Sequence, residues 1–170
     1  MIIDDFLPQD QLKFLQETFM WSLKVPYYLH NTVTNDRDSQ DKLDIWYGTN
    51  VIYNHPHVPS PYFEDVDTIF RERFEDFGAW LRIKANFYPH TKEIIEHQQH
   101  GDDNFSHGAA IFCLNTCDGY TRISQDILIK SNENRIYFFD GSIPHNSSTT
   151  ANAKGRFNIN FNYLKVKKFL

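Results

Sequence analysis

Polar and apolar residues alternate without exception in Arg156-Phe157-Asn158-Ile159-Asn160-Phe161-Asn162-Tyr163, near the end of a chain of 170 residues. A period of two is typical of a β-strand, because successive side chains point to opposite faces. One interpretation is an edge strand whose asparagines are solvated. The other is a strand that lines a polar cavity, since asparagine is a poor strand former. In that case Arg156 would offer a planar, permanently charged guanidinium to a carboxylate.

Other segments are rich in the β-branched and aromatic residues that favour strands. The expected strands cover 45–53, 80–88, 108–115, 120–130 with one break, 135–140 and 155–164. No long helical pattern separates the later strands, so an antiparallel sandwich or jelly roll is favoured over a parallel βαβ sheet. The sequence therefore predicts a mainly β fold.

Two helices are expected in the N-terminal half of the chain. Apolar residues recur at helical spacing over about 8–20, with Pro8 in the first turn. A second helical pattern follows Ser60 and runs over 61–77. Gly78 is expected to end this second helix.

Size and charge exclude several classes of protein. The length predicts one domain over 1–170, and the 41% of hydrophobic residues are sufficient to form its core. Seventeen Lys and Arg against 22 Asp and Glu give a net charge of −5. A mildly acidic chain lacks the positive field that phosphate-backbone binding requires, so nucleic acid is not expected as a partner.

Several local features bear on where the protein is found. No apolar run approaches the ~20 residues of a membrane span, and residues 1–5 lack the basic start of a signal peptide, so a cytoplasmic protein with no membrane association is expected. Cys113 and Cys117 are expected to be reduced thiols. The polar segments 30–44 and 54–61 are expected to be surface loops, the first being either a lid or simply a mobile loop.

His100 and Asp102 are the first candidate metal ligands. They lie two residues apart, so an extended backbone directs both side chains to the same face. His145 follows the strongly apolar strand 136–139 and is expected near the mouth of a barrel. Two histidines and one carboxylate bind one face of an octahedral ion and leave three positions open, which suits non-haem Fe(II) and oxygen activation.

Other interpretations of these histidines remain open. His97 with His100, or His107 with His100 and Asp102, could form a zinc site. His107 could equally support another ligand or contact the substrate. The sequence contains no G-x-S-x-G nucleophile motif and no glycine-rich phosphate loop, which argues against a serine hydrolase and a nucleotide-binding enzyme.

The order His100-x-Asp102, His145 and Arg156 resembles the Fe(II)/2-oxoglutarate-dependent dioxygenases, and most of all their prolyl 4-hydroxylase-like branch. Asn86-Phe87-Tyr88-Pro89 before the motif and 134–141 after it agree with that branch. The resemblance covers roughly 80–165 and is strongest to small stand-alone versions in phage and marine microbial sequences.

The resemblance implies a double-stranded β-helix, a jelly-roll barrel with the two N-terminal helices packed outside it. It implies Fe(II) on His100, Asp102 and His145, with no catalytic residue beyond these ligands. For the cosubstrate 2-oxoglutarate it implies contacts from Arg156, Tyr88 and Asn158, with Asn160 as an alternative to Asn158. One departure is Cys113, which stands where the branch often has a second cosubstrate-binding tyrosine.

The implied activity is hydroxylation of a C–H bond with O2, with succinate and CO2 as co-products. A peptide or a small molecule would be the substrate, and peptidyl proline is the expectation for the branch. A protein of another class remains as the alternative: a non-catalytic jelly-roll module in which the same residues hold a structural metal or another ligand.

Overall fold

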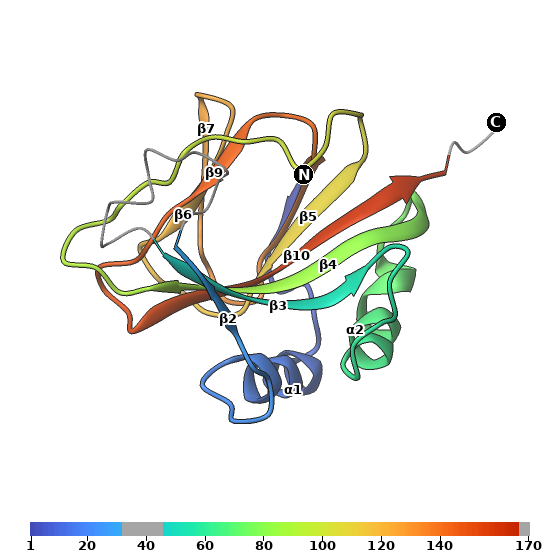
Figure 1. The fold of residues 1–170 in the computed structure, drawn as a ribbon, viewed down its shortest axis with the longest axis horizontal. Helices are drawn as coiled ribbons and strands as arrows, with labels where there is room; N and C mark the ends of the chain where they lie inside the picture. Colours follow the sequence, from blue (N-terminus) through green and yellow to red (C-terminus); the bar gives the residue numbers. More distant parts are fainter. Residues whose placement is uncertain (32–45, 167–170) are drawn as a thin grey trace.

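A computed structural model describes residues 1–31 and 46–166 as two antiparallel β-sheets and two helices (Figure 1). The elements in chain order are β1 (Ile2–Ile3), α1 (Gln9–Phe19), β2 (Tyr28–His30), β3 (Tyr47–Asn54), α2 (Phe63–Phe70), β4 (Phe77–Pro89), β5 (Gly108–Cys113), β6 (Tyr120–Ile123), β7 (Ile127–Lys130), β8 (Ile136–Asp140), β9 (His145–Ser147) and β10 (Gly155–Lys165). The mainly β fold predicted from the sequence is confirmed.

The alternating strand β10 is the centre of the larger sheet, whose order is β1-β8-β5-β10-β4-β3-β2. It pairs antiparallel with β4 on one side and with β5 on the other. In this register Arg156 lies opposite Tyr88, and Asn158 lies between Asn86 and Cys113. The smaller sheet has the order β7-β6-β9.

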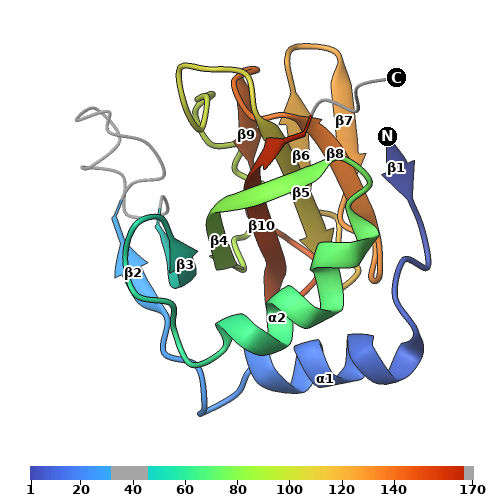
Figure 2. The ribbon, with the colours of Figure 1, turned by 90° about the vertical axis from the view of Figure 1, so that its right-hand side faces the viewer.

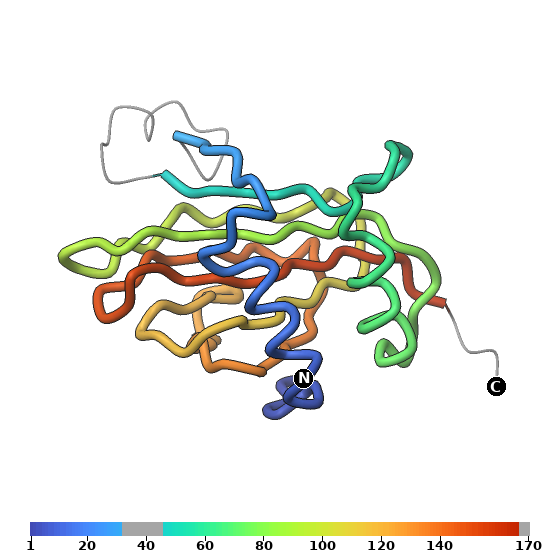
Figure 3. Tube along the Cα trace, turned by 90° about the horizontal axis from the view of Figure 1, so that it is seen from below, coloured from blue at the N-terminus to red at the C-terminus, as the bar shows by residue number. Residues whose placement is uncertain are grey.

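The two faces of the larger sheet have different covers. Helices α1 and α2 lie on one face and the strands of the smaller sheet on the other, as Figures 1 and 2 show. Seen from below, α1 crosses under the strands of the larger sheet (Figure 3). The apolar side chains of both helices pack in one cluster with the apolar face of β10, for example Leu15, Phe70 and Phe161. Burial of these side chains holds the helices against the sheet.

The polar face of β10 is buried as completely as its apolar face. Arg156 is 0% exposed, Asn158 and Asn162 are 1% exposed, and Asn160 is 8% exposed. The interpretation of this segment as a solvated edge strand is therefore wrong. A central strand covered on both sides turns its polar row towards the space between the sheets, which is the arrangement of a cavity wall.

The sequence predicted most of the elements. Each of the six expected strand ranges contains a strand or, for 120–130, the pair β6 and β7. The short strands β1, β2 and β9 were not expected, because strands of two or three residues leave no periodic pattern. The first helix is confirmed within two residues of its expected ends.

The second helix is shorter than expected. It ends at Phe70 and continues as a single 3-10 turn over 71–73, after which Phe74 has an extended backbone. Phe74 keeps the helical spacing but packs edge-on against Trp80, so tertiary packing outweighs the local pattern. Gly78 lies inside β4 instead of ending the helix. A side chain there would meet the backbone oxygen of Leu164 at 2.9 Å, so the position requires a glycine because two strands approach closely.

The remaining expectations concern loops and cysteines. Residues 55–59 form an exposed turn, as predicted for 54–61. The segment 30–44 lies, from residue 32 onward, outside the described residues. Cys113 and Cys117 are both free and buried. Within 1–31 and 46–166, no helix is long and apolar enough to cross a membrane.

Candidate metal centre

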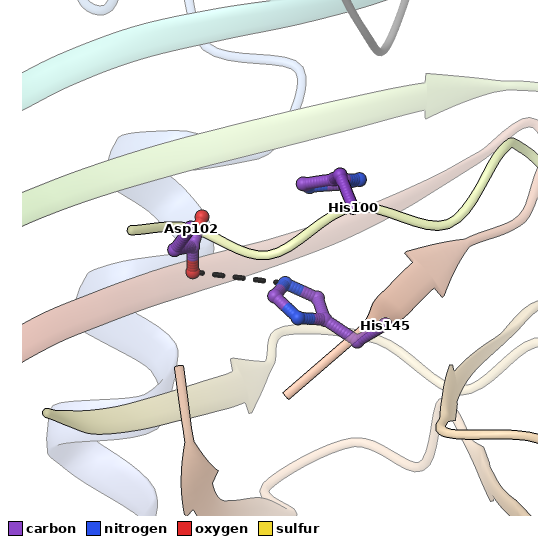
Figure 4. Close-up of side chains that lie close together, drawn as sticks. All are labelled: His100, Asp102 and His145. Atoms are coloured by element: carbon purple, nitrogen blue, oxygen red, sulfur yellow. Dashed lines mark ion pairs between the residues drawn. The ribbon is translucent and has the colours of Figure 1, made fainter. Parts of the chain in front are cut away.

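His100, Asp102 and His145 lie together although 43 positions separate the last two along the chain. The backbones of His100 and His145 form an isolated antiparallel bridge, with hydrogen bonds of 2.9 and 2.8 Å in the two directions. The amide of Asp102 donates to the carbonyl oxygen of Gly141 at 2.9 Å. One ligand atom from each of the three side chains lies within 4.8 Å of the other two. Figure 4 shows the three side chains converging on one point.

The free electron pairs of these side chains are available for a metal. Nδ1 of His145 lies 2.9 Å from the carbonyl oxygen of Ile143, and Nδ1 of His100 lies 3.4 Å from that of Gln98. Because a carbonyl can only accept, Nδ1 carries the hydrogen in both rings and Nε2 keeps its lone pair. Oδ2 of Asp102 is buried, has no hydrogen-bond partner among the described residues, and lies 3.6 Å from Nε2 of His145. The three residues thus fit a divalent ion, the kind of partner that buried acceptors without donors require.

The electrostatics of the cluster favour its metal-binding protonation state. Burial lowers the pKa of His100 below its ordinary value, which keeps the imidazole neutral. Burial is the largest single influence on Asp102 and opposes its ionisation, but several neighbouring groups, Arg82 first among them, together outweigh burial, so the pKa of this carboxyl is also lowered. Arg82 forms a hydrogen-bonded ion pair with Oδ1 of Asp102.

Arg156 is a buried cation that has no acidic partner in the part of the chain that the structure describes. Its Nη1 donates to the carbonyl oxygens of Tyr120 at 2.7 Å and Ser148 at 3.3 Å, and its Nη2 donates to Oγ1 of Thr121 at 2.7 Å. Its Nε is buried without a partner, and it forms no ion pair with any described residue. A buried charge of this kind is costly unless an anion compensates it.

A cavity of about 50 Å³ runs between these groups. Its wall includes the three candidate ligands together with Tyr88, Thr121 and Ser147. Arg156 is not itself a wall residue, but it contacts two of them: its guanidinium lies 5.3 Å from the centre of the Tyr88 ring and donates to Thr121. A larger cavity of about 590 Å³ lies elsewhere, beside β1 and the 3-10 turn, and contains none of the three ligands.

Of the other candidate cosubstrate residues, Tyr88 and Asn158 lie nearest to Arg156, and Asn160 lies further along β10. Tyr88 is buried opposite Arg156 on β4, and burial raises the pKa of the Tyr88 hydroxyl. Asn158 lies on the same face of β10 as Arg156 and accepts a 2.9 Å hydrogen bond from the amide of Asn86. Asn160 belongs to the cavity wall, whereas Asn158 does not.

The alternative zinc ligand sets do not form. Nδ1 of His97 lies 2.8 Å from Oγ of Ser147, and Nε2 of His107 lies 3.2 Å from the amide nitrogen of Asn162. In the part of the chain that the structure describes, His100, Asp102 and His145 form the one candidate metal cluster.

The surroundings of Cys113, where the resemblance leads us to expect a tyrosine, contain another hydroxyl group. Cys113 is buried on β5 opposite Asn158, and its pKa is raised by burial. The neighbouring strand β8 contributes Tyr137, whose hydroxyl donates to Oγ1 of Thr121 at 2.7 Å. Thr121 is the residue that also accepts from Arg156.

Sequence reasoning missed two cations on β4. Arg82 and Lys84 lie on the same face of this strand as Tyr88, and Lys84 lines the cavity with the candidate ligands. Burial lowers the pKa of Lys84 to about 8, and the charge of Arg82 adds to this shift. The signal was present in the sequence, because polar residues alternate with apolar ones over 82–88 as they do in β10.

Comparison with known proteins identifies the fold. No family model and no curated protein matches the sequence. The structure is similar to a prolyl hydroxylase from Trichoplax adhaerens in complex with a hypoxia inducible factor oxygen degradation domain peptide fragment, with 14% identity, a TM-score of 0.62, and coverage of 97% of this chain and 83% of that one.

Two further solved structures agree. An oxidoreductase of the 2OG-Fe(II) oxygenase family from Burkholderia pseudomallei has 11% identity, a TM-score of 0.62, and coverage of 99% and 88%. HygX from Streptomyces hygroscopicus, with nickel and 2-oxoglutarate bound, has 8% identity, a TM-score of 0.64, and coverage of 98% and 82%. The chain therefore has the fold of the 2OG-Fe(II) oxygenases, which confirms the resemblance seen in its sequence at the level of the fold.

Proposed function

We propose that this protein is a non-haem Fe(II)- and 2-oxoglutarate-dependent dioxygenase that hydroxylates a C–H bond. One observation carries the proposal: a partly buried set of two imidazoles and a carboxylate shares a cavity wall with the residues that contact a buried guanidinium, which has no acidic partner among the described residues. The first group suits a divalent metal, and the second suits a carboxylate. A cosubstrate that chelates metal at one end and carries a carboxylate at the other satisfies both.

The proposal assigns a role to each residue. His100, Asp102 and His145 would hold Fe(II). Arg156 would pair with the distal carboxylate of 2-oxoglutarate, with Tyr88 and either Asn158 or Asn160 beside it. The chemistry supplied by iron with 2-oxoglutarate and O2 is the oxidation of a C–H bond to an alcohol, with succinate and CO2 as co-products. No further side chain is assigned an acid or base role.

The protein's own contribution is to bind, orient and exclude water. The Arg82 ion pair and the Ile143 carbonyl fix the orientation of Asp102 and His145. The polar face of β10 and the smaller sheet both contribute to the wall of the cavity, where the fixed charges act in a medium of lower dielectric constant than bulk water. This role belongs to the whole of 1–170 as a single oxygenase domain, with the two sheets as the halves of a double-stranded β-helix barrel and the helices outside it.

The substrate part of the proposal is less specific. HygX and the prolyl hydroxylase share the fold, and the prolyl hydroxylase is in complex with a peptide fragment. Hydroxylation of peptidyl proline is the proposal that follows from the sequence motifs, and a small molecule is the other substrate class.

Anaerobic spectroscopy tests the function. Fe(II) and 2-oxoglutarate added to the protein without oxygen should produce a weak visible charge-transfer band, and admission of air should release succinate. A non-catalytic jelly-roll module would produce neither the band nor succinate. Zn(II) in place of Fe(II) is the control, because it can occupy the same ligands but cannot activate oxygen.

A further inference from the structure

Lys84 lies in the cavity of the candidate metal centre, but no part of the proposed metal and cosubstrate chemistry uses it. It lies opposite Asn160 in the β4–β10 ladder and lines the cavity with His100 and Asp102. Its ammonium group makes no hydrogen bond or ion pair with any residue in the described ranges 1–31 and 46–166. Partial burial of an ammonium group without a partner is unfavourable, so this group could be stabilised by binding an anion.

Lys84 is separated from the Arg156 end of the cavity. Arg156 lies opposite Tyr88, whereas Lys84 lies opposite Asn160, four residues further along both strands. At about 3.3 Å per residue this is roughly 13 Å along the sheet. At this separation of their backbone positions, we expect the two cations to contact different carboxylates.

The charges in the cavity also call for a second anion. A divalent metal, the Asp102 carboxylate, dianionic 2-oxoglutarate and the Arg156 guanidinium together carry no net charge. Adding Arg82 and Lys84 brings the sum to +2, because the Asp102 charge that pairs with Arg82 is already counted. Positive charge at Lys84 would be left uncompensated beside the reacting centre.

We infer, on the basis of the proposed function, that Lys84 binds a carboxylate group of the substrate. The carbon that is hydroxylated would then lie close to this carboxylate in the substrate molecule. Because the cavity that Lys84 lines is only about 50 Å³, we expect this group to be compact. The inference favours a free amino acid or an acidic side chain over proline within a peptide, because the latter has no carboxylate beside the ring.

Calorimetry on the full chain tests the inference without turnover. The protein is loaded with Ni(II) and 2-oxoglutarate, the pair bound in HygX, and titrated with L-proline, L-glutamate, their carboxamides, and capped tripeptides centred on Asp or Pro. We expect at least one carboxylate to bind at least tenfold more tightly than its uncharged counterpart. Lys84→Met should remove that advantage, by about tenfold to a hundredfold, the range for a charge-assisted hydrogen bond. Binding of the free acids or of the Asp peptide identifies the source of the carboxylate.

Matched controls make each outcome decisive. Lys130→Met, at an exposed lysine of β7, should bind every probe like the wild type. The affinity for 2-oxoglutarate should be unchanged in Lys84→Met and reduced in Arg156→Met. The inference is overturned if acids and amides bind alike, or if no carboxylate binds. It is also overturned if Lys84→Met binds the probes like the wild type, or if Lys84→Met lowers the affinity for 2-oxoglutarate as much as Arg156→Met does. If the wild type fails to bind 2-oxoglutarate, the proposed function itself is wrong and this inference falls with it.

Discussion

Arg82 and Asp102 form an ion pair in which Arg82 occupies one carboxylate oxygen and leaves the other facing Nε2 of His145. The pair fixes the carboxylate so that its free oxygen points to the centre of the ligand cluster. Since β4 supplies Arg82 and the segment before β5 supplies Asp102, the orientation of a metal ligand depends on a strand of the larger sheet. Such outer contacts typically contribute a factor of about 10–100 to metal affinity.

Asp102→Ala should abolish Fe(II) binding. The substitution removes the only carboxylate of the candidate cluster, so the loss should exceed the factor of about 100 that outer contacts can cost. Anaerobic titration of the protein with Fe(II) measures this. Asp103→Ala changes an exposed carboxylate one residue away and should leave the affinity intact. Wild-type affinity in Asp102→Ala would remove this residue from the site.

Arg156→Met should weaken 2-oxoglutarate binding while leaving Fe(II) binding in place. Loss of a buried charge-assisted pair costs about 2–5 kcal/mol, which is roughly thirtyfold to several thousandfold in affinity. Titration of the metal-loaded protein with 2-oxoglutarate measures the affinity. Arg71→Met, which removes a surface arginine, is the control. Arg156→Lys keeps the charge and should lose less, which separates a binding role from a purely structural one.

The free energy of unfolding should fall between pH 7 and pH 5, in part because of His97. Burial lowers the pKa of this histidine to about 4, and it is 3% exposed. The unfolded chain takes up the proton near pH 6.5, but the folded chain resists it, so stability is full above that pH and is lost as the pH falls towards 4. The complete shift corresponds to about 3 kcal/mol. Urea unfolding at several pH values should show a shallower slope for His97→Gln, whereas the exposed His90→Gln should retain the wild-type slope.

Phe70→Ala should destabilise the fold by about 3–5 kcal/mol, the range for deleting a buried phenylalanine. Phe70 is 0% exposed, and its ring centre lies 4.6 Å from that of Phe161 on the apolar face of β10. Chemical denaturation measures the change. Phe14→Ala, at a side chain 41% exposed on α1, should cost far less. Equal effects of the two substitutions would contradict the assignment of the core.

Local patterns in the sequence predicted the elements better than the contacts between them. The alternation in β10 identified a strand and its polar face, because side-chain direction follows from backbone geometry alone. The early end of α2 could not be predicted from the sequence, since Phe74 continues the helical spacing. Only its packing with Trp80 distinguishes a helix that ends at Phe70 from one that continues through Phe74.

The candidate site depends on long-range contacts that no local pattern encodes. His100 and Asp102 share a face by their spacing, but the bridge that brings His145 to them joins an irregular segment to a strand of three residues. The sequence indicated His145 only through its place after the apolar strand 136–139, and the family resemblance then supported it as the third ligand. Lys84 was missed for a different reason. The sequence predicts its strand, and the alternation over 82–88 places Lys84 on the polar face, but the pattern alone does not show that this face lines the candidate site.

The strict alternation of polar and apolar residues in β10 has an evolutionary consequence. From Gly155 to Tyr163, the side chains of one face pack in the apolar core and those of the other face point towards the cavity, and every residue in this range is buried. Inserting or deleting a single residue would exchange the two roles over the rest of the strand, placing asparagines among phenylalanines and phenylalanines beside Arg156. This part of the gene can therefore diverge by replacement of individual codons, whereas changes of length are confined to the turns that flank the strand.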